Sequence, residues 1–134
     1  MSDRAHDILR KVYGHQEFRG RQAEIITHVA GGGDALVLMP TGGGKSICYQ
    51  IPAMLRDGLG VVISPLIALM QDQVAALKQF GIAAAFLNSS LDPEAMREVE
   101  LQLRQGALKL LYVAPERLVN PRFLDLLGSL KLAL

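Results

Sequence analysis

A glycine-rich stretch, "MPTGGGKS" at residues 39–46, carries the residue types that bind phosphate. Glycine lets successive backbone N–H groups point inward without side-chain obstruction, and such groups form a concave anion site. Lys45 supplies a point charge for the β- and γ-phosphates, and the hydroxyl of Ser46 can ligate Mg²⁺. An apolar run at 35–39 precedes the stretch, and a helical pattern begins near Lys45. A strand, a glycine loop and a helix in this order predict a phosphate-binding loop.

The loop departs at one position from the strict pattern G-x-x-x-x-G-K-S, because Met39 stands where that pattern has glycine. That first glycine mainly permits a tight exit from the strand, so the phosphate chemistry remains. The alternative is a glycine-rich turn with a chance lysine. The residues predicted to hold the nucleotide phosphates are Thr41, Gly42, Gly43, Gly44, Lys45 and Ser46, with Lys45 as the catalytic residue and Ser46 as the Mg²⁺ ligand.

The elements around the loop alternate between apolar runs and helical patterns. Strands are predicted at 35–39, 60–64, 83–87, 108–114 and 131–134, and they are almost continuously apolar, as strands buried on both faces are. Helices are predicted near 3–13, near 20–30, from Lys45, from Ile67 to a stop at Gly81, and from a capping Asp92 to a stop at Gly106. Their buried stripes are Ile67, Met70, Val74 and Leu77 in one helix and Met96, Val99 and Leu103 in another. This alternation predicts an α/β fold in which a parallel sheet has helices on both faces.

The composition fits one globular domain, since the 134 residues are 50% hydrophobic and 20% charged. A net charge of +1 gives no electrostatic case for nucleic acid and does not exclude a locally basic groove. The single cysteine, Cys48, rules out an internal disulfide and is expected to pack in the core, and the histidines form no metal-ligand cluster. With no signal peptide and no run of about 20 apolar residues, we expect no membrane partner and a reducing, intracellular location. The final "KLAL" looks like the beginning of a strand, so we expect a truncated domain whose exposed apolar surface promotes self-association.

Four segments together resemble the RecQ family of DNA helicases, within helicase superfamily 2. They are "FRGRQ" (18–22), "MPTGGGKSICYQIPA" (39–53), "SPLIALMQDQV" (64–74) and "YVAPERL" (112–118), and they occur in the family's order along essentially the whole chain. Met39 is the family's usual residue at its position. The resemblance implies a P-loop NTPase of the RecA-like kind, with residues 1–134 as the N-terminal part of the first motor domain.

The resemblance also implies roles for residues outside the loop. The segment 13–22 is similar to the family's adenine-recognition motif, in which Gln22 reads the edge of the base and His15 and Arg19 lie against its faces. Ser64 and Pro65 are implied to contact single-stranded DNA, and so is Arg117 in a loop formed by residues 115–117. The simpler alternatives are the first turn of a surface helix for Gln22 and a strand entering a core helix for 64–74. For Arg117 they are an ion pair with Glu116 or a contact with another part of the fold.

The activity implied for the complete protein is ATP- and Mg²⁺-dependent 3′→5′ unwinding of single-stranded or forked DNA in recombination and repair. In the family, a D-E-A-H motif holds Mg²⁺ and orients the attacking water, and these 134 residues contain no such motif. We therefore expect this chain to bind ATP without hydrolysing it, and we expect zinc only in family regions that the chain lacks. Two alternatives are another P-loop NTPase or kinase and a non-catalytic nucleotide-binding module.

Overall fold

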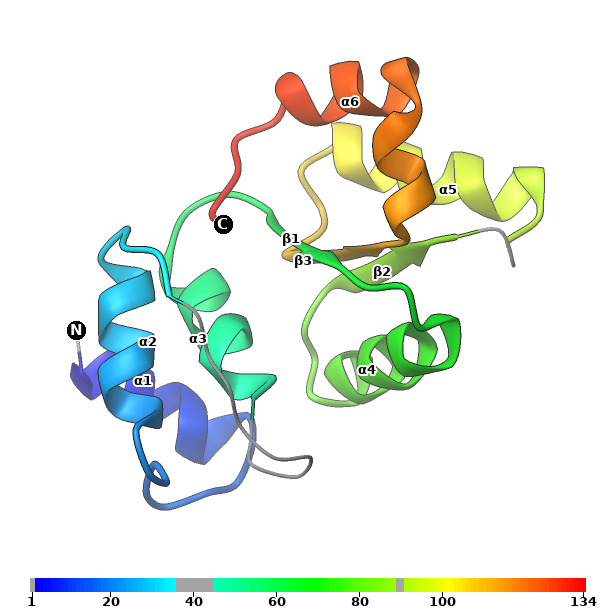
Figure 1. Ribbon diagram of the computed structural model, residues 1–134. Helices are drawn as coiled ribbons and strands as arrows, with labels where there is room; N and C mark the ends of the chain where they lie inside the picture. The colour runs from blue at the N-terminus through cyan, green and yellow to red at the C-terminus, as the bar shows by residue number, and fades with distance from the viewer. Residues whose placement is uncertain (1, 36–44, 89–90) are drawn as a thin grey trace. The chain divides into compact units, whose positions relative to one another are not determined.

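The structure is a computed structural model, and it describes residues 2–35, 45–88 and 91–134 (Figure 1). Residues 36–39 of the predicted strand at 35–39 and the glycines of the phosphate loop therefore lie outside the described residues. The chain divides into two compact units, Met1–Arg56 and Asp57–Leu134, which we call the N-terminal unit and the C-terminal unit.

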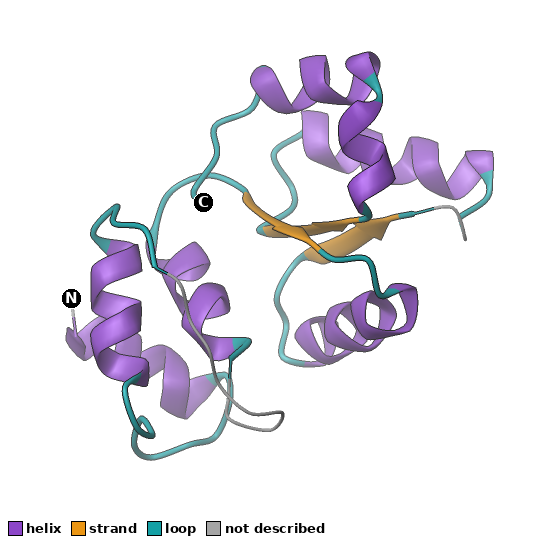
Figure 2. Cartoon of the chain, in the orientation of Figure 1, coloured by secondary structure: helices purple, strands orange, loops and turns teal. Residues whose placement is uncertain are grey.

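In its described residues, the N-terminal unit consists of helices and loops (Figure 2). The helices are α1 (Ser2–Lys11), α2 (Gln22–Ala30) and α3 (Ile47–Leu55), and all three pack against one another. Their apolar faces enclose a small core of Ala5, Leu9, Ile26, Ile47 and Ile51, against which Ile8, Tyr13, Phe18 and Leu55 pack. The helices predicted near 3–13, near 20–30 and after Lys45 are confirmed, with starts and ends shifted by one or two residues.

The C-terminal unit is built on a parallel sheet, as its apolar runs predicted. The described strands are β1 (Gly60–Ile63), β2 (Ala84–Leu87) and β3 (Leu110–Val113), in the spatial order β1-β3-β2. All four residues of β3 are buried, whereas Ile63 at the end of β1 is 53% exposed. All three strands carry the continuously apolar pattern, and β3, which lies between the other two, is the one buried along its whole length.

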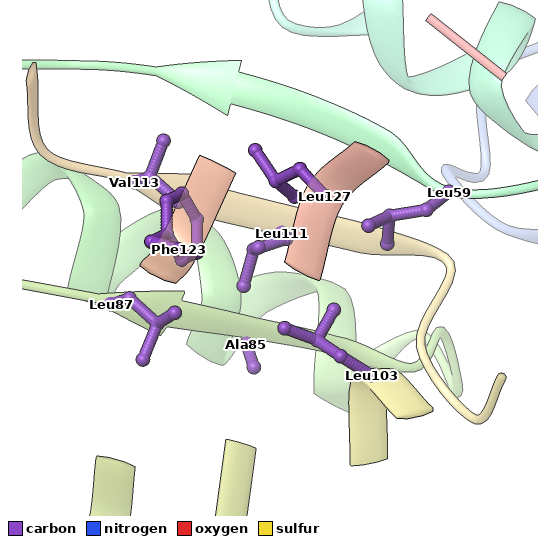
Figure 3. Close-up of a cluster of buried hydrophobic side chains, with 8 residues drawn as sticks. All are labelled: Leu59, Ala85, Leu87, Leu103, Leu111, Val113, Phe123 and Leu127. Carbon is purple, nitrogen blue, oxygen red and sulfur yellow. The ribbon is translucent and has the colours of Figure 1, made fainter. Parts of the chain in front are cut away.

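Helices cover both faces of this sheet. Figure 1 shows α4 (Ile67–Gln79) on one face and α5 (Pro93–Arg104) and α6 (Pro121–Gly128) on the other. The predicted stripe of α4 is confirmed at its three buried positions, Met70, Val74 and Leu77. Side chains from β2, β3, α5 and α6 point toward one another in the second core (Figure 3). That core consists of Leu59, Ala85, Leu87, Leu103, Leu111, Val113, Phe123 and Leu127.

Side-chain caps explain where α5 and α6 begin. The Asp92 carboxylate accepts a hydrogen bond from the backbone N–H of Ala95 at 2.7 Å, as predicted from the sequence. The Asn120 side chain accepts from the N–H groups of Arg122 and Phe123 at 3.0 and 3.3 Å. The sequence prediction missed α6, although an asparagine followed by proline is a helix-start signal. It also treated residues 115–117 as a loop, whereas they belong to a 3₁₀-helix, η1 (Pro115–Val119).

The prediction of a strand at 131–134 was wrong, because the segment is too briefly paired to form one. The segment forms one parallel bridge, between Leu132 and Leu59, and does not join a ladder. Three backbone hydrogen bonds of 2.7–2.9 Å still hold it beside the start of β1: Leu59 N–H to Lys131 O, Ala133 N–H to Leu59 O, and Val61 N–H to Leu134 O. A strand requires consecutive bridges, and only one is present here.

Candidate functional site

The residues predicted to bind a base line one cavity in the N-terminal unit. His15, Arg19 and Gln22 surround a cavity of about 200 Å³, together with Glu17 and two apolar residues, Leu9 and Ile47. Pockets for whole drug-sized ligands measure about 300–1,000 Å³, so this cavity suits one part of a ligand, such as a single base. His15, Arg19 and Gln22 were predicted from the sequence, and the fold brings them together.

Gln22 is the most enclosed of the three predicted base-binding residues, since its exposed fraction is 3%. Its Oε1 accepts a hydrogen bond from the backbone N–H of Arg19 at 2.8 Å, and the backbone N–H of Gln22 donates to the Arg19 carbonyl at 3.1 Å. The two bonds close the loop that leads into α2, and the first of them fixes the direction of the carboxamide. A carboxamide held in one orientation presents a defined donor and acceptor, as base recognition requires.

The other two predicted base-binding residues are more open, since His15 and Arg19 are both exposed. Nearby, the carboxylate of Glu17 lies 3.9 Å from the His6 imidazole, whose ring meets the Phe18 ring edge-on. The sequence prediction missed Glu17, Leu9 and Ile47 as cavity residues. The helical stripes of α1 and α3 identify the two apolar residues as buried, but only the packing shows that they form a cavity wall.

The start of α3 carries the two described residues of the phosphate loop. Lys45 is exposed and Ser46 is half-buried. Ser46 occupies the N-cap position of α3, yet its hydroxyl makes no capping hydrogen bond. A side-chain oxygen that the helix does not use suits a Mg²⁺ ligand, and a helix N-terminus favours anions. Thr41 and Gly42–Gly44 lie outside the described residues, so their roles stay predictions.

Cys48 follows Ser46 on α3 and is buried, which confirms the prediction that it packs in the core. Burial raises the pKa of its thiol, because the low-dielectric surroundings disfavour the thiolate. A thiol of this kind is a weak nucleophile. We therefore assign it no chemical role.

The segments predicted to contact DNA begin at the carboxyl ends of the strands in the C-terminal unit. Ser64 follows β1, and its backbone N–H donates to the carbonyl of Val113, the last residue of β3, at 3.0 Å. Its hydroxyl accepts a hydrogen bond from the N–H of Leu66 at 3.2 Å, and Pro65 between them is exposed. Pro115 begins η1 directly after β3. The carboxyl ends of neighbouring parallel strands thus bring the two predicted segments together, at the edge where open α/β sheets bind ligands.

The side chain of Arg117 is engaged with the helical layer of the C-terminal unit. Its guanidinium carbon lies 5.4 Å from the centre of the Phe123 ring, a cation–π distance. Its Nε is buried and has no hydrogen-bond partner among the described residues. The residues that surround it in a cavity of about 180 Å³ are Met96, Glu100, Arg104, Asn120, Arg122, Phe123 and Leu126. This geometry gives Arg117 a packing role, and its contact with DNA stays a prediction.

The part of the chain that the structure describes has neither a metal-ligand cluster nor a membrane-spanning helix. Residues 2–35, 45–88 and 91–134 contain no cluster of three or more histidine, cysteine, aspartate or glutamate side chains that could hold a metal ion. None of the helices in these ranges has the length and apolar character needed to cross a membrane. Self-association through exposed apolar surface stays a prediction.

Comparison with known proteins identifies the family. The DEAD/DEAH box helicase family model matches residues 19–132, which is most of the chain. The chain belongs to the DEAD/DEAH box helicase family. Within this family it is similar to the ATP-dependent DNA helicase RecQ of Haemophilus influenzae, at 51% identity over 95% of the chain, and to that of Bacillus subtilis, at 44% over 100%. It is also 44% identical to ATP-dependent DNA helicase Q1 of Mus musculus, over 87% of the chain.

This helicase chain spans 18–23% of the length of those three relatives. The family match confirms the resemblance read from the four sequence segments. It also supports the P-loop NTPase fold class, with which the parallel sheet and its helices are consistent.

Proposed function

We propose that this chain is the ATP-binding N-terminal part of the first motor domain of a RecQ-like 3′→5′ DNA helicase. The observation that carries the proposal is the cavity lined by His15, Arg19 and Gln22, which we call the base cavity. Gln22 lines this cavity together with Ile47, the first residue of α3, and α3 directly follows Lys45 and Ser46. The cavity wall at Ile47 therefore adjoins Lys45 and Ser46 in sequence, so a base in the cavity and the phosphates attached to it can be bound next to each other.

Each residue has a stated role in this proposal. The Gln22 carboxamide accepts from N6 of adenine and donates to N7, while His15 and Arg19 lie against the purine faces. Lys45 pairs with the β- and γ-phosphates, and the backbone of residues 41–44 surrounds them. Ser46 is the residue of this chain that holds Mg²⁺, and the ion neutralises charge on the phosphates.

Binding without hydrolysis is the activity we propose for the 134 residues alone. Hydrolysis requires an acid that positions Mg²⁺ and a residue that orients water, and the sequence contains no D-E-A-H motif. In the complete protein, ATP turnover would drive movement along single-stranded DNA and separation of the duplex, as in recombination and repair. Ser64, Pro65 and Arg117 are the DNA-contacting residues in this proposal.

The test of nucleotide binding is titration of the chain with ATP and Mg²⁺. We expect Lys45→Ala to weaken ATP binding by about 10- to 150-fold, because the substitution removes charge-assisted hydrogen bonds worth about 1.5–3 kcal/mol. Lys78→Ala is the matched control, since Lys78 is an exposed lysine on α4 in the C-terminal unit. An equal loss in both variants, or phosphate release by the wild-type chain that Lys45→Ala abolishes, would contradict the proposal.

The test of DNA contact is the binding of a fluorescent single-stranded oligonucleotide. Replacing Arg117 by Lys keeps the charge and removes the planar group that packs on Phe123. If Arg117 contacts phosphate, Arg117→Lys retains part of the binding and Arg117→Met loses more. If Arg117 only packs, both variants lower the free energy of unfolding and leave DNA affinity unchanged, and the DNA role of this residue is then wrong.

A further inference from the structure

One hydrogen bond joins the base-cavity loop, residues 13–22, to α3, the helix that follows the phosphate loop. The hydroxyl of Tyr13 donates to Oε1 of Gln50 at 2.7 Å, across 37 positions of sequence. Gln50 is 4% exposed and lies one turn into α3, where its backbone N–H donates to the carbonyl of Ser46 at 2.9 Å. The Tyr13 hydroxyl therefore bonds a residue that is itself bonded to the phosphate loop.

The ring of Tyr13 is held firmly enough to act as an anchor. It packs against the core of the N-terminal unit, and the chain turns directly after it at Gly14, where φ is +74°. The N–H of His15 donates back to the carbonyl of Leu9 at 3.2 Å. Tyrosine combines an apolar body with a polar tip, so packing fixes the ring while the hydroxyl reaches a buried partner. Tyr13 thus fixes the point at which the base-cavity loop leaves α1.

The two sides of the base cavity depend on this bond. His15, Arg19 and Gln22 come from the loop that Tyr13 begins, and the opposite wall includes Ile47 of α3. Gln50 lies on that same helix. Holding Tyr13 against Gln50 therefore sets the separation between the loop side of the cavity and the helix side.

We propose that Tyr13 and Gln50 are positioning residues that hold residues 13–22 at a fixed distance from Lys45 and Ser46 at the start of α3. With this distance set, the base and the phosphates of one nucleotide are bound together. The proposal rests on the proposed function, in which ATP binds at this site. It predicts that loss of the bond weakens binding of the whole nucleotide and leaves binding of the phosphates alone unchanged.

The structure offers a matched control. In the C-terminal unit, the hydroxyl of Tyr112 donates to Oε1 of Gln73 at 3.1 Å, across 39 positions, and this pair is also partly buried. Tyr13→Phe and Tyr112→Phe therefore remove the same atom from the same kind of bond. Only the first bond adjoins the predicted nucleotide site.

The experiment compares affinities for ATP, GTP and inorganic triphosphate, each with Mg²⁺, in the wild-type chain and both variants. For Tyr13→Phe we expect ATP binding to weaken by about three- to tenfold, the scale of one neutral hydrogen bond, and the preference for ATP over GTP to fall. Triphosphate binding should not change in this variant. Tyr112→Phe should leave all three affinities unchanged. Equal weakening of ATP and triphosphate by Tyr13→Phe, or the same ATP effect from both variants, would overturn the proposal.

Hydrogen exchange without nucleotide provides an independent measurement. Tyr13→Phe should speed exchange of backbone amides in residues 13–22, and Tyr112→Phe should not. Unchanged exchange in Tyr13→Phe overturns the positioning role, whatever the nucleotide affinities show. A wild-type chain that binds no ATP overturns the proposed function instead, so the two failures are distinguishable.

Discussion

The two units hold their candidate site residues in different ways. In the N-terminal unit, side chains fix the loop, through the bonds of Gln22 to Arg19 and of Tyr13 to Gln50. In the C-terminal unit, backbone pairing places Ser64 beside Val113, as the parallel register of β1 and β3 requires. A single substitution can therefore disturb the base cavity without unfolding the protein, whereas the edge of the sheet keeps its geometry as long as the sheet is intact.

The hydrophobic cores of the two units also differ, both in size and in what borders them. The core around α1, α2 and α3 has five buried members among the described residues, and the core between the sheet, α5 and α6 has eight. Leu9 in the first core also borders the base cavity, whereas Leu111 in the second lies on the central strand. Removing atoms from a site costs less where the surroundings can collapse. The smaller core beside an open cavity should therefore tolerate truncation better.

The largest expected effect comes from truncating a leucine in each core. Leu111 is 0% exposed and Leu9 is 1% exposed, so the two changes remove equally buried side chains. We expect Leu111→Ala to lower the free energy of unfolding toward the upper end of the range of about 2–5 kcal/mol, and Leu9→Ala toward the lower end. Urea unfolding measures both. Equal losses of unfolding free energy, or a larger loss for Leu9→Ala, would contradict the expected difference between the two cores.

The next effect is expected from adding a methyl group at one glycine in each unit. Gly58 has φ +102° and Gly20 has φ +53°, so alanine is strained at both. At Gly58 a Cβ would also lie 2.5 Å from the carbonyl oxygen of Lys131, whereas at Gly20 it would meet nothing within 4 Å.

We therefore expect Gly20→Ala to cost about 1–2 kcal/mol from backbone strain alone. Gly58→Ala should cost about 1–3 kcal/mol more, because the backbone atoms that it meets must move. Thermal or urea unfolding of both variants checks the difference. If the two losses are the same, then the segment 131–134 does not constrain the start of β1.

The smallest expected effect concerns helix caps. Asp92 caps α5 through its side chain, whereas Ser46 stands at the N-cap of α3 without making that bond. Asp92→Ala should lower the free energy of unfolding by about 1 kcal/mol. Ser46→Ala should change it by less than about 0.5 kcal/mol and should weaken ATP binding only when Mg²⁺ is present.

Circular dichroism during urea unfolding, with ATP titrations in Mg²⁺ and in EDTA, measures these effects. A clear loss of stability in Ser46→Ala would mean that its hydroxyl serves the helix. A loss of ATP binding that does not depend on Mg²⁺ would argue against its role as a metal ligand.

Most elements of the fold could be predicted because their patterns are local. The buried stripe of α4 and the Asp92 cap of α5 depend on residues within a few positions of one another, and the structure confirms both. The prediction failed where a pattern was short. The run at 131–134 is apolar like a strand but forms one bridge, and α6 has only eight residues, although Asn120 and Pro121 mark its start.

By itself, the sequence determined the family, most of the described strands and helices in their order, and the residue types suited to bind a nucleotide. These depend on composition, periodicity and motif spacing, which are properties of short segments. Only the tertiary structure decided that His15, Arg19 and Gln22 share a cavity with Ile47, that Arg117 packs on Phe123, and that Tyr13 bonds Gln50. Packing sets such contacts between distant segments, and no local pattern in the chain encodes the distance between two side chains that are 37 residues apart.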